Sequence, residues 1–346
     1  MRKLWLIGIG ITFLIISCED SPPFRKINVP DTPITYASER MDHDIFAANY
    51  SNPGAARQQL YQKYGTFYCH YVEDILRVGP CDNDSSAAAL EGFVTWPDMI
   101  ELQREVDRIH PQEATEAMDQ EFRQALQRWT FFFPDSVIPS VVYMNSGLNY
   151  SAYCTDSVWA VGLDYFLGPD NPLMKKLPSD LFPGYLKEDM KEEYAVVNIM
   201  KDFCQRETSQ SIPFASRPDL LNLLIFHGKV MFLTDVLMPD TADSTKMNWT
   251  AAQSKWAKDN EWNTWKTIAR QEVMFGTDMN TNVRWFDFGP FTNAASVPHD
   301  SPAQLGVWMG WNIVRAYMME HPDLTPSQLL LISNDREILQ AYKPKR

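Results

Sequence analysis

The six histidines of this chain are its first candidates for metal binding or general-base chemistry, and their spacing favours neither. No two of them form HExxH, the helical pattern in which two histidines hold zinc and a glutamate activates the bound water. The hydrolase pattern G-x-S-x-G and the phosphate-binding pattern G-x-x-x-x-G-K-[ST] are also missing. Because these catalytic motifs are absent, the sequence predicts no metal, no cofactor and no catalytic residue.

Three polar side chains, His227, Lys229 and Asp235, stand inside the long apolar stretch of residues 220–238. A helix that is apolar on every side belongs in the middle of a domain, so charges within it must be paired or lie at its rim. We expect Lys229 and Asp235 to find partners in the core and His227 to be a core or rim residue. The alternative is that the three belong to a relict site. Gly228 weakens a helix by about 1 kcal/mol relative to alanine, which predicts a closely packed neighbour there.

Four acidic residues stand close together at the start of a helix predicted over residues 187–206; they are Glu188, Asp189, Glu192 and Glu193. Negative charge at this position complements the helix dipole, which is the structural interpretation. A glycosidase would need a second carboxylate across a cleft, and the sequence does not show whether one is there.

The four cysteines beyond Cys18 could form disulfides but contain no redox motif. Cys69, Cys81, Cys154 and Cys204 permit three pairings in an exported domain, and no CxxC pair is present. Cys69 and Cys81 are the closest in sequence, and a Gly-Pro turn lies between them. We therefore favour a Cys69–Cys81 disulfide.

The N-terminus has the pattern of a bacterial lipoprotein signal. Arg2 and Lys3 precede a 13-residue apolar run, which is too short to span a bilayer as a helix and matches a secretory signal. Ser17-Cys18 then resembles a lipobox, so we predict that residues 1–17 are removed and Cys18 is lipidated. An uncleaved anchor and an unlipidated signal are the alternatives. Residues 18–35, rich in proline and polar groups, are expected to form a tether.

Composition excludes two broad classes of protein. The 346 residues are 45% hydrophobic and 22% charged, which is typical of a globular chain and not of a disordered one. The formal net charge is −13 and no basic run offsets it, so binding to nucleic acid is not expected.

The periodicity of apolar residues predicts helices on both sides of a short β region. Helices are expected over residues 97–109, 112–132, 187–206, 220–238 and 304–319, with another opened by a Thr250–Gln253 capping box. Three short strands are expected over residues 138–144, 150–154 and 158–165, close enough together for an antiparallel meander. The prediction is therefore an α+β fold, mostly helical with one small antiparallel sheet, in a single domain over residues 36–346.

Several segments together resemble the gliding motility lipoprotein GldB family of Bacteroidetes. The resemblance covers essentially the whole mature chain, and the lipobox fits it. The segments that carry it are residues 161–170 (VGLDYFLGPD), 227–240 (HGKVMFLTDVLMPD), 256–265, 289–291 (GPF), 301–302, 306–317 (GVWMGWNIVRAY) and 342–344.

This resemblance implies a cell-envelope protein of the gliding apparatus, lipid-anchored and facing the periplasm. More distantly, residues 310–317 look like a family of predicted zinc-dependent proteases that carry HExxH on the helix after the sheet. Here that helix has no histidine, and His227 stands where a glutamate is expected, so a zincin-like scaffold without its metal is implied. We expect a non-enzymatic protein that binds envelope partners, the alternative being an envelope hydrolase with a site other than HExxH.

Overall fold

The described part of the chain is a mostly helical α+β structure around one four-stranded sheet, as predicted. The expected signal peptide and Cys18 lie outside the described residues. The computed structural model describes residues 27–31, 33–211, 217–294 and 296–345.

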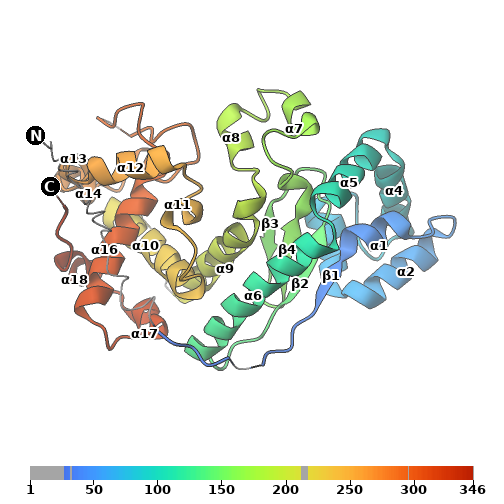
Figure 1. Ribbon diagram of the computed structural model, residues 1–346, viewed down its shortest axis with the longest axis horizontal. Coiled ribbons are helices and arrows are strands. Elements are labelled where there is room, and N and C mark those ends of the chain that lie inside the picture. The colour runs from blue at the N-terminus through green and yellow to red at the C-terminus, as the bar shows by residue number, and fades with distance from the viewer. Residues whose placement is uncertain (1–26, 32, 212–216, 295, 346) are drawn as a thin grey trace, which may run out of the picture.

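Helices up to residue 211 surround the sheet, and those after it form a second body beside it (Figure 1). The first group is α1 (Met41–Ala47), α2 (Pro53–Tyr64), α3 (Thr66–His70), α4 (Asp84–Thr95), α5 (Pro97–Ile109), α6 (Gln112–Phe132), α7 (Pro172–Lys176), α8 (Gly184–Glu188) and α9 (Ala195–Ser211). The second group is α10 (Leu220–Leu237), α11 (Asp243–Lys246), α12 (Ala251–Asp259), α13 (Glu261–Ile268), α14 (Gln271–Met274), α15 (Met279–Asn282), α16 (Leu305–Glu320), α17 (Pro326–Leu331) and α18 (Asp335–Gln340).

The sheet is mixed, so the predicted antiparallel meander is wrong in topology. Its strands are β1 (Ser38–Arg40), β2 (Ser140–Met144), β3 (Ala152–Cys154) and β4 (Val158–Gly162), in the spatial order β1-β2-β4-β3. β3 forms an antiparallel hairpin with β4, but β4 returns to lie parallel to β2. β1, which the sequence did not predict, adds a second parallel pair at the other side of β2.

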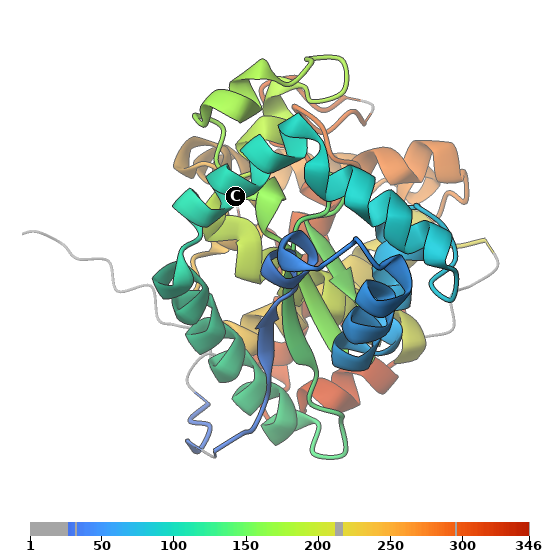
Figure 2. The same cartoon turned by 90° about the vertical axis from the view of Figure 1, so that its right-hand side faces the viewer.

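Both faces of the sheet are covered by helices (Figure 2). Alternate residues of a strand point to opposite faces, so Val141 and Tyr143 of β2 pack with α6 and α9, whereas Val142 and Met144 pack with α1 to α4. A parallel strand covered on both sides must be apolar throughout, which explains the continuous run of apolar residues in β2.

Helix α10 joins the two bodies because its residues belong to both cores. Phe226, Val230 and Leu233 pack into the core that covers the sheet, and Leu224 and Phe232 pack into the core of the C-terminal body. A helix with two buried sides has no polar face, and this accounts for its apolar character all round. Its length and hydropathy would suit a membrane span, but 89% of the window is buried inside the protein.

Helices α10 and α16 cross at two glycines, which confirms the close approach predicted at Gly228. A Cβ atom on Gly228 would lie 2.2 Å from the carbonyl oxygen of Gly310, and one on Gly310 would lie 2.0 Å from the carbonyl oxygen of Leu224. Both distances are far below van der Waals contact, and both neighbours are backbone atoms that cannot rotate away. The two helix backbones therefore touch here.

The segment before β1 runs along α6 without regular secondary structure. Arg128 donates to the carbonyl oxygen of Ile27 at 3.3 Å, and the Gln127 amide donates to Asp31 at 2.8 Å. The described second half of the expected tether therefore lies against the body of the protein.

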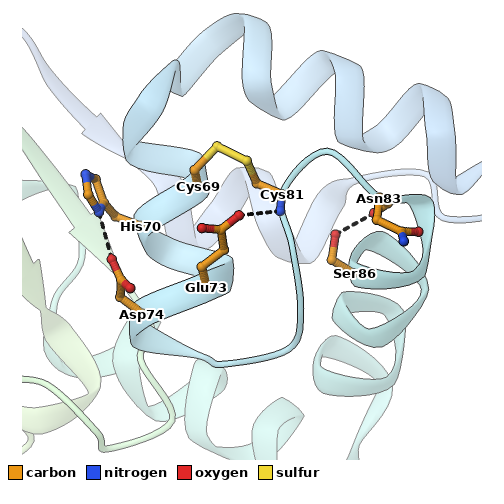
Figure 3. The surroundings of a disulfide bond; sticks show 7 residues. All are labelled: Cys69, His70, Glu73, Asp74, Cys81, Asn83 and Ser86. Atoms are coloured by element: carbon orange, nitrogen blue, oxygen red, sulfur yellow. Dashed lines mark hydrogen bonds and ion pairs between the residues drawn. A yellow bond between two sulfur atoms is a disulfide. The ribbon is translucent and has the colours of Figure 1, made fainter.

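A disulfide joins Cys69 of α3 to Cys81, in the loop that leads to α4 (Figure 3). This is the pair favoured from the sequence. The Glu73 carboxylate, one turn after Cys69, accepts the backbone N–H of Cys81 at 2.7 Å and holds the same loop. Cys154 and Cys204 have free thiols.

Candidate functional site

The largest described cavity is a cleft of about 570 Å³ between the sheet and the C-terminal body. Helices α8 and α9 and the start of β3 form one wall, and α10 and the loops around residues 246–248 and 286–288 form the other. The cleft is therefore built from segments far apart in the sequence. A concave site where two bodies meet is the usual position for a binding or catalytic site.

Helix α9 supplies a polar stripe to this cleft. Asn198, Lys201, Asp202 and Gln205 all line it, and their i, i+3, i+4, i+7 spacing places them on one face of the helix. The other face, with Met200 and its neighbours, is buried against the sheet. Burial of one face thus fixes the direction in which the stripe points.

Lys201, Asn248 and Asp189 form a polar chain in the cleft. The Lys201 ammonium donates to Asn248 Oδ1 at 2.9 Å, and the Asn248 side chain also hydrogen-bonds to Asp189. Burial raises the pKa of the Asp189 carboxyl to about 6, against the lowering effects of Lys201 and Asn248. Burial lowers the pKa of Lys201 to about 8, although Asp189 opposes this. An acid and a base with pKa values displaced toward neutrality in one cleft are a mark of a functional site.

Two residues of the cleft have a left-handed backbone. Asn248 has φ = 53° and Gln304 has φ = 62°, a region that non-glycine residues seldom occupy. Asn248 bridges Lys201 and Asp189, and Gln304 donates to the carbonyl oxygen of Phe286 at 3.1 Å. Such conformations persist only where surrounding contacts enforce them, and they cluster at functional sites.

His227 lies in the wall of the cleft, stacked on Phe286 with their ring centroids 4.6 Å apart. Burial lowers the pKa of His227 to about 4, so its imidazole is neutral at pH 7. Of the three polar residues that the sequence singled out in this helix, His227 is the one that lines the cleft.

Lys229 and Asp235 each have partners of their own, and His227 is not among them. Lys229 donates to the carbonyl oxygen of Ile332 at 2.6 Å. Asp235 accepts from the Lys246 ammonium at 2.8 Å and from the Arg315 guanidinium at 2.6 and 2.8 Å. The structure therefore does not bring the three residues together as one site.

Two side-chain groups among the described residues bring three metal-type ligand atoms within 4.8 Å, and neither includes a cleft residue. In the group of Cys69, Glu73 and Cys81, the sulfurs are already joined to each other. In the group of Asp42, His43 and Asp107, the Asp42 carboxylate already holds the guanidinium of Arg40. Neither group offers a free set of ligands.

Lys201 and Asn248 were not predicted from the sequence, and Asp189 was predicted only as part of an acidic helix start. The helix predicted over residues 187–206 is broken: α8 ends at Glu188 and α9 begins at Ala195, so Asp189 lies in the connection and turns into the cleft. The polar stripe of α9 was a signal available in the sequence. The position of Asn248 was not, because it depends on the distant wall.

Comparison with known proteins places the chain in one family. Residues 24–344 match the family described as gliding motility protein GldB, so the chain belongs to that family. Membership implies involvement in gliding motility, and the lipoprotein character of the family suggests a lipid-anchored place in the cell envelope. No curated protein and no solved structure matches the chain. The likeness to a zinc-protease scaffold remains a prediction.

Proposed function

We propose that this member of the GldB family is a lipid-anchored envelope protein that acts without catalysis, by binding a segment of another gliding-machinery protein in its cleft. The observation that carries the proposal is a combination of two features. Exposed aromatic residues stand at the opening of the cleft, which we call its rim, and polar side chains line its interior, which we call the polar floor: the α9 stripe together with Asp189 and Asn248. Tyr185 of α8 is 38% exposed and Phe288 on the opposite wall is 66% exposed. Rigid aromatic side chains around a groove are typical anchors for a protein segment.

The polar floor adds orientation to this binding. Asn248 holds the Lys201 ammonium at one point, and Asp189 adds a carboxylate beside it. Fixed polar groups in a binding cleft set the direction of a bound chain. The expected partner segment therefore combines an apolar side chain for the rim with a polar group for Lys201.

Phe288→Ser should remove the partner from a pull-down of the lipidated protein out of its own envelope. The loss is expected because an exposed aromatic anchor contributes to binding and little to folding. Lys201→Met should weaken capture as well. Leu181→Ser is the matched control, since Leu181 is 68% exposed and does not line the cleft. Identification of the same co-purifying proteins with all three variants would overturn the role of the cleft.

An envelope hydrolase is the second candidate, and the displaced pKa values of Asp189 and Lys201 favour it. The two functions separate when purified protein is incubated with its own envelope fraction and the products are examined by mass spectrometry. New cleavage products made by the wild type and not by Lys201→Met would establish a hydrolase. Identical product spectra together with retained partner capture support binding alone.

Cys18→Ala should give a species that no longer labels with fatty acid. The motif predicts cleavage before Cys18 and acylation of its sulfur and new amino group, and several acyl chains hold a protein far more firmly than one. Metabolic labelling of cells that produce either form measures this. Equal labelling of wild type and variant would show that Cys18 is not the anchor.

A further inference from the structure

Four exposed apolar side chains belong to segments at the end of the molecule where α6 ends, and we name this group the anchor-side surface. Ile27 is 36% exposed, Phe131 48%, Val137 65% and Leu331 76%. Single exposed apolar residues are ordinary, but a gathering of them marks an interaction site.

Hydrogen bonds and helix contacts, together with Figures 1 and 2, place the segments that carry these four residues at one end of the molecule. Arg128 in the last turns of α6 bonds to Ile27, and Phe131 follows in the same helix. Leu331 ends α17, which contacts α9 and α10, and α6 contacts the same two helices. Figures 1 and 2 both place the end of α6, the loop that follows it and α17 at the lower end of the protein.

The length of the chain before Ile27 limits how far this end can lie from the membrane. Nine peptide steps separate Cys18 from Ile27, and whatever their conformation they span at most roughly 30 Å. A compact body of about 310 residues has a radius of gyration of about 20 Å, and thus a diameter of roughly 50 Å. The anchor is therefore too short for the opposite end of the body to face the membrane at close range.

We propose that the anchor-side surface rests on the bilayer that holds Cys18, with its apolar side chains in the lipid headgroup region. This inference depends on the proposed lipid anchor.

This orientation leaves the cleft open to partners. Helix α8, which carries the rim residue Tyr185, lies at the upper end of the molecule in Figure 1, opposite α17. A body resting on its anchor-side surface therefore presents the rim away from the membrane, toward proteins of the periplasm.

The test uses an environment-sensitive fluorophore on single cysteines of the mature chain. Val137→Cys and Leu331→Cys probe the surface, and Phe288→Cys and Leu181→Cys are controls of matched exposure. All four carry Cys154→Ser, because that thiol is free and only partly buried. A hexahistidine tag in place of Cys18 attaches each protein to phosphatidylethanolamine–phosphatidylglycerol vesicles that contain a nickel-chelating lipid.

We expect the probes at positions 137 and 331 to shift to the blue on vesicles and to be quenched by nitroxide lipids, while both controls keep their solution spectra. Equal quenching at all four positions, or none at position 137, would overturn the proposal. A blue shift that needs high protein concentration and no vesicles would also overturn it, because a second copy would then cover the surface. Since the nickel-chelating lipid replaces the natural anchor, failure here is distinct from failure of Cys18 lipidation.

Discussion

Gly228→Leu should lower the free energy of unfolding by about 3 kcal/mol or more. The Cβ of any residue at this position would stand 2.2 Å from the carbonyl oxygen of Gly310, and 2.7 Å from a methyl group of Val314. Relief requires α10 and α16 to move apart, and these two helices share the largest interface of the C-terminal body. Overpacking of a core typically costs about 1–3 kcal/mol and occasionally more, and a rigid backbone obstacle belongs at the upper end of that range.

Urea denaturation of Gly228→Leu measures this loss, with Gly92→Leu as its matched control. Gly92 also lies inside a helix, α4, but a Cβ there would meet no atom within 4 Å. Leucine is the better helix former by roughly 0.5–1 kcal/mol, so Gly92→Leu should leave stability unchanged or raise it. Wild-type unfolding of Gly228→Leu would mean that the two helices do not touch at this point.

The sequence predicted helix α10 well because the signals for it are local. Asp219 and Asn222 form a capping box at its start, and the apolar run between this cap and Pro239 has the length of a buried helix. The same holds for the Thr250–Gln253 capping box of α12. The packing role of Gly228 could also be predicted, because a glycine inside a helix is itself a local signal of close packing.

Strand pairing is not a local property, and here the sequence misled. Residues 152–154 follow β2 directly, so a meander was the natural expectation. The pairing of β2 with β4 depends on burial. Both strands carry apolar residues on each face, for example Val142 on one face and Val161 on the other, and a central position in the sheet buries both faces.

The cleft depends still more on distant segments. Lys201 lies on α9 and Asn248 lies 47 residues later, beyond α10 and α11. The spacing of polar residues in α9 can be recognised in the sequence and indicates one wall of the cleft. No residue pattern near Asn248 indicates that this residue faces the α9 stripe. The left-handed backbone at Asn248 likewise emerges only once both walls are assembled.

Asp235→Asn should be the most destabilising loss of a single charge in the described structure. Asp235 and Lys246 are fully buried, and the Asp235 carboxylate also accepts the indole N–H of Trp311 at 2.7 Å. Removing one member of a buried ion pair leaves the other charge without compensation, which costs about 3–5 kcal/mol. We expect the free energy of unfolding to fall by that amount.

Asp243→Asn is the milder comparison, because Asp243 pairs with the same Arg315 but is partly exposed. The Asp243 side chain is 32% exposed and that of Arg315 13%, and Arg315 would keep both of its hydrogen bonds to Asp235. Solvent screening weakens a partly exposed pair, so this variant should lose clearly less stability than Asp235→Asn.

A second substitution tests whether the buried ammonium causes the loss. In Asp235→Asn combined with Lys246→Met, the buried ammonium is removed together with the carboxylate, so part of the stability should return. Contacting residues are not additive, and a double-mutant cycle measures their coupling. Purely additive losses would mean that the Asp235 network does not depend on Lys246, and stability would then come from Arg315 and Trp311 alone.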